Sequence, residues 1–251
     1  MHDKKMVKYS FCITCYNSKD IVDDFIEPLL NLKDDYEIII VDGGSKDGTY
    51  EKLKKYEKDN IKILRENCST GKGRDIALKA SQGEIIITLD FDVRIEKPLM
   101  IVENFNKLNI DKIIRFSIKN SQCTNTIYVG KRDLFLKVGG FPHLVAADDV
   151  YFDKKLKKLN IIEFKEIDLP HKCLYINNKS SGITSRYEKN ILKKIKRRIL
   201  VTRDNIFVQN LNFKDFIKFY KLTGYKIYVI GIPLYLIGKF LSYFVKIPKL
   251  D

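Results

Sequence analysis

The stretch GEIIITLDFDV, residues 83–93, joins an apolar run to two acids that are separated by one residue. The apolar part, Ile85 to Leu89, has the length and the β-branched composition of a buried strand. Carboxylates are rarely buried without a partner, so Asp90 and Asp92 are expected at the rim of the fold rather than in its core. This stretch predicts a buried strand that delivers two carboxylates to a ligand.

Similar apolar runs alternate with helical segments through the first third of the chain. The expected strands are 8–14, 36–42, 61–66 and 84–90, and the expected helices are 20–32, 49–59 and 71–83. This alternation predicts an α/β fold with a parallel sheet covered on both faces. Ligands of such sheets bind at the carboxyl ends of the strands, where Thr14, Asp42 and Asp90 fall.

The pattern loosens beyond residue 93, and the expected elements become more mixed. They are helices over 97–108, 131–140 and 148–159, and strands over 111–119 and 160–167. A chain of 251 residues can bury a full core and suits one domain with an appendage. We expect one domain over 1–185 and a helical appendage over 186–251.

The cysteines and the start of the chain indicate the compartment. There are five cysteines, an odd number, and the first ten residues have no apolar segment typical of a secretory signal. We therefore expect a reducing compartment and no disulfide framework. Cys12 and Cys15 have C-x-x-C spacing, but they lie on an expected strand without a second pair. We interpret them as core residues, with a redox or metal role as the alternative.

Positive charge is concentrated near the C-terminal end. The net charge is +14, and residues 189–226 hold eleven Lys and Arg against two Asp. This basic segment continues into an apolar one, residues 225–247, and a membrane surface accounts for both. Nucleic-acid binding would need base-stacking groups among the charges, so we do not expect it. The predicted location is the cytoplasmic face of the cell membrane, the side that Lys and Arg favour.

The form of membrane contact stays open at this point. Residues 227–238 carry no charge, but Lys239 falls within the roughly 20 residues that a span requires. The segment could be an imperfect span, an anchor in the membrane plane, a re-entrant segment or a helix for a partner protein.

Five pieces of the chain, in this order, resemble the inverting glycosyltransferases of family two, which have the GT-A fold. They are YSFCITCYNSKDIVDDFIEPLL (9–30), YEIIIVDGGSKDGTYE (36–51), GKGRDIALKASQGEIIITLDFDV (71–93), YVGKRDLFLKVGGF (128–141) and ADDVYFDKKL (147–156). The resemblance covers about residues 8 to 172. It implies a Rossmann-like domain with a mixed, mainly parallel sheet, a nucleotide-sugar donor, and Mg²⁺ or Mn²⁺ as cofactor.

The resemblance also implies residues for the nucleotide. Thr14 and Tyr16 would flank the base of the donor, and Asp42 matches the first acid of the usual VDDGSTDGT motif. The second acid of that motif is Gly43 here. This departure leaves the identity of the base open, and a tight turn is the alternative role of this loop.

The diphosphate and the metal would lie near the D-x-D pair. By resemblance Asp92 is the metal ligand, and Asp90 contacts the ribose or a metal-bound water. Lys72 and Arg74 stand at a helix start, where backbone N–H groups favour anions, although surface charge explains them equally well. His171 falls where relatives place a histidine near the metal or diphosphate, and a purely structural role is its alternative.

The base is expected at the start of the helix over 148–159. Relatives usually have Glu-Asp there, whereas this chain has Asp148 followed by Asp149. The resemblance makes Asp149 the base that deprotonates the acceptor, and Asp148 the donor-side acid. Capping of the helix is the alternative role for this pair.

The function implied is metal-dependent transfer of a sugar to an acceptor hydroxyl or phosphate. The acceptor would be a polyprenyl phosphate or a lipid-linked glycan, bound near residues 117–147. Nucleotidyl transfer to a sugar phosphate is one alternative, but it would favour a Gly-rich basic loop after the first strand, which CYNSKDIVDD is not. A non-catalytic nucleotide-sugar-binding membrane scaffold is the other, and the presence of both Asp92 and Asp149 argues against it.

Overall fold

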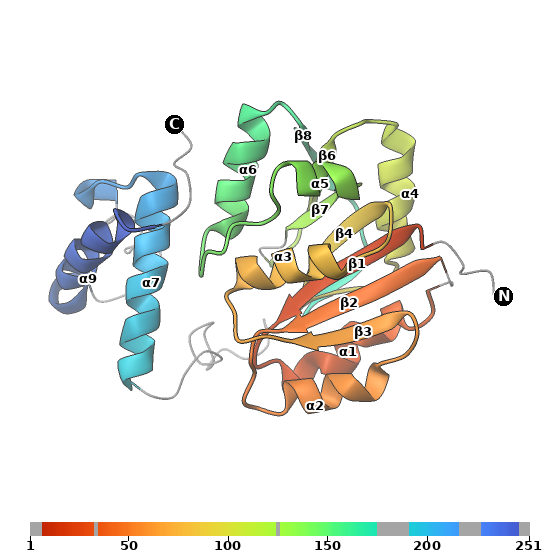
Figure 1. The fold of residues 1–251 in the computed structure, drawn as a ribbon, viewed down its shortest axis with the longest axis horizontal. Coiled ribbons are helices and arrows are strands. Elements are labelled where there is room, and N and C mark those ends of the chain that lie inside the picture. The colour runs from red at the N-terminus through yellow and green to blue at the C-terminus, as the bar shows by residue number, and fades with distance from the viewer. Residues whose placement is uncertain (1–6, 33–34, 124–125, 175–190, 216–226, 246–251) are drawn as a thin grey trace.

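A computed structural model describes residues 7–32, 35–123, 126–174, 191–215 and 227–245. Within these residues a seven-stranded sheet has the order β3-β2-β1-β4-β7-β6-β8 (Figure 1). Its strands are β1 (Tyr9–Cys15), β2 (Tyr36–Asp42), β3 (Ile61–Arg65), β4 (Ile85–Asp90), β6 (Ile113–Ile118), β7 (Ile127–Lys131) and β8 (Ile162–Ile167). Strand β7 is antiparallel to both neighbours, and the other pairs are parallel. The predicted mixed, mainly parallel sheet is confirmed.

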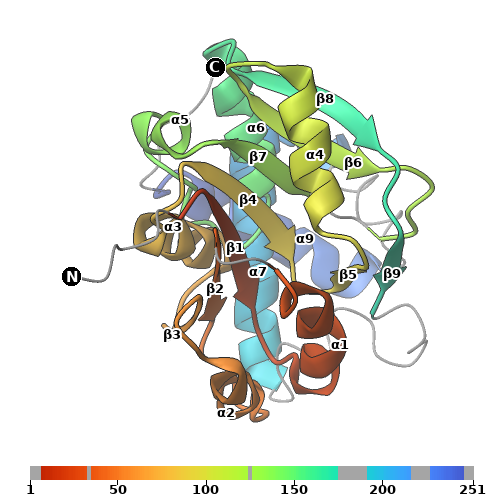
Figure 2. The same cartoon turned by 90° about the vertical axis from the view of Figure 1, so that its right-hand side faces the viewer.

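Helices cover both faces of this sheet (Figure 1, Figure 2). One layer consists of α1 (Val22–Ile26), α2 (Thr49–Leu53) and α4 (Leu99–Leu108), and the other of α3 (Thr70–Ala80), α5 (Arg132–Lys137) and α6 (Asp148–Lys158). Successive strand residues point to opposite faces, so Phe11 and Ile13 pack in the first layer and Cys12 in the second. Both faces of the sheet are therefore buried.

The parallel register brings the polar strand ends to one edge. Cys15 pairs with Asp42 on one side of β1, and Thr14 pairs with Asp90 on the other. These residues therefore end three neighbouring strands at the same level. The expected location of Thr14, Asp42 and Asp90 at strand ends is confirmed.

A second sheet of two strands corrects one expectation about the cysteines. Strands β5 (Val93–Ile95) and β9 (His171–Cys173) pair antiparallel, directly after the D-x-D pair. Cys173 forms a disulfide with Cys123, which follows β6. The expectation of no disulfide framework did not foresee this pair, because the two cysteines are 50 residues apart in sequence and meet only through the fold.

Two expected helices are broken in the structure. The segment over 20–32 consists of a 3₁₀ turn at Lys19–Ile21, the helix α1, and a second 3₁₀ turn at Glu27–Leu29. Pro28 has no backbone N–H to continue the helical hydrogen bonds, which explains the second break. The segment over 49–59 is α2 followed by a 3₁₀ turn at Lys54–Tyr56.

Two C-terminal helices, α7 (Ile191–Gln209) and α9 (Ile227–Ser242), pack against each other beside the sheet domain (Figure 1). They approach closely at Gly238, where a Cβ atom would lie 2.7 Å from Cγ2 of Thr202. Among the described residues, no helix combines the length and apolar character needed to cross a bilayer. Residues 186–190, 216–226 and 246–251 of the expected appendage lie outside the described residues.

Candidate active site

A cavity of about 470 Å³ opens at the carboxyl edge of the sheet. Its walls come from β1 and the loop after it, the loops after β2 and β3, the start of α3, the end of β4, and α7. The lining residues are Thr14, Cys15, Tyr16, Ser18, Val41, Gly43, Asn67, Cys68, Ser69, Thr70, Gly73, Asp90, Phe91, Asp92, Val145, Lys196, Arg197 and Leu200.

Four of the predicted donor and metal residues meet in this cavity. They are Thr14, Tyr16, Asp90 and Asp92. Gly73 allows the start of α3 to approach β1, because a Cβ atom there would lie 2.8 Å from Cγ2 of Thr14. The floor of the cavity thus combines strand ends with a closely packed helix start.

Asp42 lies beside the cavity, and its carboxylate is buried in the loop after β2. It accepts hydrogen bonds from the backbone N–H of Ser45 at 3.1 Å and from the Ser45 hydroxyl. The Arg65 Nε atom lies 3.5 Å from the same carboxylate. Asp42 therefore shapes the turn around Gly43, which does line the cavity, and a direct contact with the donor stays a prediction.

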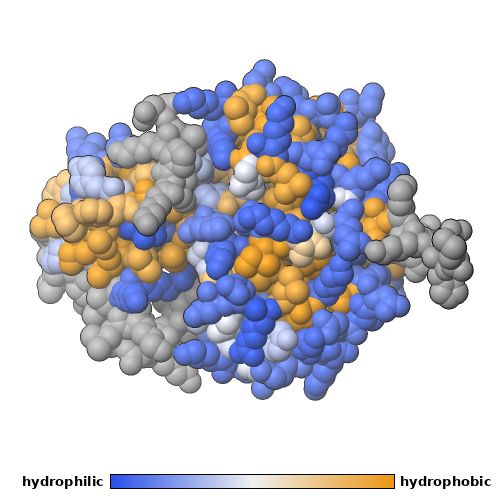
Figure 3. All heavy atoms as spheres, in the orientation of Figure 1, coloured by the Kyte–Doolittle hydropathy of each residue, from blue (hydrophilic) through white to orange (hydrophobic). Residues whose placement is uncertain are grey.

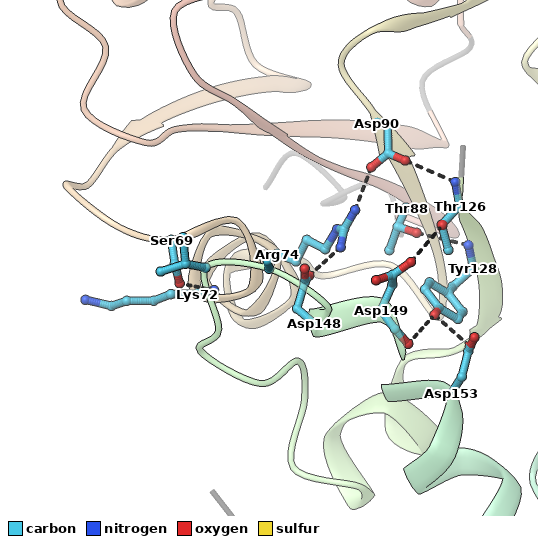
Figure 4. A network of polar contacts seen from close by, with 12 residues as sticks. Ser69, Lys72, Arg74, Thr88, Asp90, Thr126, Tyr128, Asp148, Asp149 and Asp153 are labelled. Atoms are coloured by element: carbon cyan, nitrogen blue, oxygen red, sulfur yellow. Dashed lines mark hydrogen bonds and ion pairs between the residues drawn. The ribbon is translucent and has the colours of Figure 1, made fainter. Parts of the chain in front are cut away.

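Arg74 connects the two acidic parts of the site (Figure 4). Its guanidinium donates to Asp90 Oδ1 at 2.6 Å and to the carboxylate of Asp148. The second oxygen of Asp90 accepts a hydrogen bond of 3.0 Å from the backbone N–H of Thr126. Burial alone would lower the pKa of Arg74, but the carboxylates of Asp148 and Asp90 outweigh it and raise that pKa. The guanidinium stays charged and fixes both acids.

Asp149 lies next to this bridge at the start of α6. Its side chain is 29% exposed, whereas that of Asp148 is 7% exposed. The Asp149 carboxylate is 3.5 Å from the Thr126 hydroxyl and 3.7 Å from Nη2 of Arg115. The N-terminus of α6 also favours a negative charge at this point. Asp149 is therefore the more accessible member of the acidic pair, and its role as the base stays a prediction.

Arg115 belongs to a polar cluster beside Asp149 that the sequence analysis did not single out. From β6 it contacts Asp149 and forms an ion pair with Asp153, one turn further along α6. Asp153 accepts a 2.7 Å hydrogen bond from the hydroxyl of Tyr128. Burial raises the pKa of Asp153. The signal available in the sequence was the spacing of Asp149 and Asp153, four residues apart and so on one side of the helix.

Lys72 and His171 do not line the cavity. The Lys72 Nζ atom donates to Glu66 Oε1 at 3.0 Å, and its backbone N–H donates to Ser69 Oγ as part of the cap of α3. His171 pairs with Ile95 across the small sheet, and its Nδ1 lies 2.8 Å from the carbonyl oxygen of Leu169. The roles expected for these two residues stay predictions.

The chemistry of the cavity fits a hard divalent cation. Asp90 and Asp92 supply carboxylate oxygens, the ligands that Mg²⁺ and Mn²⁺ prefer. Asp90 is shared between Arg74 and Thr126, and the role of Asp92 as the metal ligand stays a prediction. The described residues contain no group of three or more ligands for a metal. Mg²⁺ commonly binds through one or two carboxylates together with substrate phosphates, and the two acids of this cavity suit that mode of binding.

Both cysteines of the C-x-x-C pair are buried, and Cys15 also lines the cavity. Cys12 packs in the core between the sheet and α3, and Cys15 is buried at the end of β1. Burial raises the pKa of both thiols, which disfavours the thiolate needed for redox or metal chemistry. The structure supports the interpretation of these cysteines as core residues.

Curated proteins similar in sequence are polymer glycosyltransferases. The chain is 33% identical over 122 residues to a poly(ribitol-phosphate) beta-glucosyltransferase of Bacillus spizizenii, a match covering 45% of this chain and 19% of that protein. It is 31% identical over 102 residues to a poly-beta-1,6-N-acetyl-D-glucosamine synthase of Staphylococcus aureus, covering 38% and 25%. The match thus spans about a quarter or less of the length of these relatives.

Solved structures of glycosyltransferases share the fold. TarS of Staphylococcus aureus in complex with UDP-GlcNAc superposes with a TM-score of 0.57 at 16% identity, covering 92% of this chain and 79% of that one. The mannosyltransferase PcManGT from Pyrobaculum calidifontis, in complex with GDP-Man and Mn²⁺, gives 0.55 at 15% identity, covering 94% and 69%. At sequence identities of 15–16%, the similarity to these structures shows a shared fold and nothing more.

The family assignment comes from the sequence itself. The profile of Glycosyl transferase family 2 matches residues 10–137, about half of the chain. The matched region runs from β1 to α5 and contains the D-x-D pair together with most of the cavity wall. The expected resemblance is confirmed, and the chain belongs to glycosyl transferase family 2.

Proposed function

We propose that this protein is an inverting glycosyltransferase that moves a sugar from a nucleotide-sugar donor to an acceptor. The observation that carries the proposal is the Arg74 bridge. It joins Asp90, at the donor cavity, to Asp148, the neighbour of the candidate base Asp149. This bridge connects the cavity to the start of α6, where the candidate base lies, and such proximity of donor and base is what an in-line displacement requires.

In this mechanism Asp149 takes the proton from the acceptor hydroxyl. The acceptor oxygen then attacks the anomeric carbon of the sugar while the bond from that carbon to the diphosphate breaks, so the configuration inverts. Thr126 and Arg115 hold the Asp149 carboxylate toward the acceptor side. Asp92 would hold a divalent cation, whose positive charge would stabilise the departing diphosphate.

The donor we propose is a nucleoside diphosphate sugar. Support comes from the fold neighbours described in complex with UDP-GlcNAc and with GDP-Man and Mn²⁺. Thr14, Tyr16 and the loop around Gly43 would receive the nucleoside, since they form the cavity wall at the ends of β1 and β2.

The acceptor we propose is a polyprenyl phosphate or a lipid-linked glycan at the cytoplasmic face of the cell membrane. Support comes from the outer face of α9, where apolar side chains gather at the left of the molecule (Figure 3). The exposed residues are Leu236, Ile237 and Phe240 on α9, and Tyr243 and Phe244 in the turn that follows it. Such a face suits insertion into the interface of a bilayer, parallel to its plane.

The test is a panel of nucleotide sugars in thermal-shift measurements with and without Mn²⁺, followed by donor hydrolysis. The proposal expects stabilisation by at least one nucleotide sugar and slow release of its nucleoside diphosphate. Release of pyrophosphate from a nucleoside triphosphate and a sugar phosphate would instead identify a nucleotidyltransferase. Donor binding without any hydrolysis or transfer would indicate the non-catalytic scaffold.

A further inference from the structure

Helix α7 supplies part of the wall of the donor cavity, although it follows the family-matched region by more than fifty residues. Its contribution consists of Lys196, Arg197 and Leu200. Leu200 follows Lys196 by four residues and Arg197 by three, and such spacings place side chains on one side of a helix, so this side of α7 faces the cavity. Two cationic side chains therefore reach a site that the sequence placed entirely in the sheet domain.

Residues in the next two turns of α7, on the same side of the helix, attach it to α6 and to the loop before α6. Asp204 is fully buried, and one of its oxygens accepts hydrogen bonds from the backbone N–H groups of Val145, at 2.7 Å, and Ala146, at 3.2 Å. Val145 itself lines the cavity. Further along, Lys154 of α6 donates to the carbonyl oxygen of Val208 at 2.6 Å. The helix is thus anchored where Lys196 and Arg197 can act on a bound ligand.

The charged side chains of the cavity wall indicate what Lys196 and Arg197 could bind. Among the described lining residues, the acids are Asp90 and Asp92, and the cationic side chains are Lys196 and Arg197. The buried Arg74 is engaged by two carboxylates, and Lys72 pairs with Glu66 outside the wall. A nucleoside diphosphate brings strong negative charge into this space, and Lys and Arg are the side chains that stabilise phosphate oxygens.

We propose that Lys196 and Arg197 of α7 bind the diphosphate of the donor, so that the C-terminal helix completes the active site. This inference rests on the proposed function, because it assumes that the cavity receives a nucleoside diphosphate sugar. The anchor at Asp204 sets where the two side chains reach. Loss of the pair removes charge-assisted contacts to phosphate and leaves the nucleoside contacts of Thr14 and Tyr16 in place.

The test compares the full-length double variant Lys196→Gln, Arg197→Gln with the control Arg198→Gln. Arg198 is the next residue of the same helix and is not part of the cavity wall. Glutamine keeps helix propensity and much of the side-chain length, so the helix is retained, and circular dichroism checks this. Calorimetry then measures binding of UDP, GDP and the corresponding monophosphates, with Mn²⁺ present.

The proposal expects the double variant to bind the favoured nucleoside diphosphate roughly 10- to 100-fold more weakly than wild type, with a smaller loss for the monophosphate. The control should stay within about twofold of wild type, a difference too small to reflect a lost ionic contact. Equal affinities in the double variant and the control would overturn the inference and leave the proposed function standing. Absence of nucleotide binding by the wild type would overturn both.

Discussion

Two adjacent acids, Asp148 and Asp149, differ in what surrounds them. Asp148 is buried against Arg74, and Asp149 is partly exposed beside Thr126 and Arg115. We expect Asp149→Asn to bind donor normally and to lose transfer by roughly 10²- to 10⁴-fold, the usual contribution of a general base. Calorimetry for the donor and a transfer assay measure the two effects separately.

The matched control for this prediction is Asp148→Asn. That change removes a charge from the Arg74 bridge, so it should lower stability and donor binding together. Near-normal turnover in Asp149→Asn, combined with an inactive but well-folded Asp148→Asn, would assign the base to Asp148 instead.

Asp92 is the residue on which the metal prediction depends. We expect Asp92→Ala to stay folded and to abolish the increase in donor affinity that Mn²⁺ produces, because the cation loses its protein ligand. Calorimetric titrations with nucleotide in Mn²⁺ and in EDTA give the comparison. A variant that still responds to Mn²⁺ as wild type does would show that Asp92 is not the ligand.

At the scale of single residues, the sequence predicted the strand ends well. Thr14, Asp90 and Asp92 could be placed because apolar periodicity fixes where each parallel strand stops. The sequence could not place the Nζ atom of Lys72. In the structure this atom pairs with Glu66, and Lys72 does not line the cavity. Arg115 was invisible for another reason, since its contact with Asp149 depends on how β6 and α6 pack.

At the scale of elements, the contact between α7 and the loop before α6 depends on Asp204. We expect Asp204→Ala to lower the free energy of unfolding by about 2–4 kcal/mol, because two backbone N–H groups lose their acceptor in a buried place. Chemical denaturation measures this change. Asp215→Ala, an exposed acid in the same C-terminal part of the chain, should have little effect. Equal stability of the two variants would contradict the anchor.

The same residue makes a prediction about pH. Burial raises the pKa of Asp204 above its ordinary value. Protonation therefore favours the folded state: this contribution is complete below the ordinary carboxyl pKa and is lost as the pH rises through the raised one. Asp204→Asn cannot titrate, so its stability relative to wild type should improve as the pH rises through that window. A difference between the two proteins that is constant with pH would exclude a raised pKa.

Elements that satisfy a simple period were predictable, and those that depend on distant partners were not. The strands β1, β2, β3 and β4 are apolar runs, so their bounds were nearly correct. The antiparallel strand β7 was not predicted: it has five residues, and its Gly130 lies against Ile113 of β6, a neighbour that only the fold supplies. Strands β5 and β9 have three residues each, too short for any period.

At the scale of the whole molecule, α7 lies between the donor cavity and the helix with the apolar outer face. One side of α7 contacts the sheet domain through Asp204, and Thr202 packs against Gly238 of α9. The sequence predicted a basic helix followed by an apolar segment, but the buried contacts of Asp204 and Gly238 arise only in the folded chain. A membrane surface that engages α9 would therefore be mechanically connected to the donor site.

The membrane prediction tests the outer face of α9 directly. We expect the full-length protein to float with anionic vesicles, and the double variant Leu236→Glu, Phe240→Glu to float at least about tenfold less. Leu236 and Phe240 are both more than 60% exposed. Glutamate at these positions should therefore weaken insertion into the membrane without disturbing the core. Leu159→Glu is the control, because Leu159 is 51% exposed on the sheet domain, away from α9.

Salt separates the two contributions to this binding. Screening weakens the attraction of Lys and Arg in α7 to anionic lipid, at about 1 kcal/mol for each residue that reaches the surface, and it leaves apolar insertion in place. Wild type should therefore bind less at high salt yet retain a residual bound fraction. The α9 variant should lose this residual fraction. Wild-type protein that fails to float at both salt concentrations would contradict the membrane proposal, and the proposal of a lipid-linked acceptor would lose its main support.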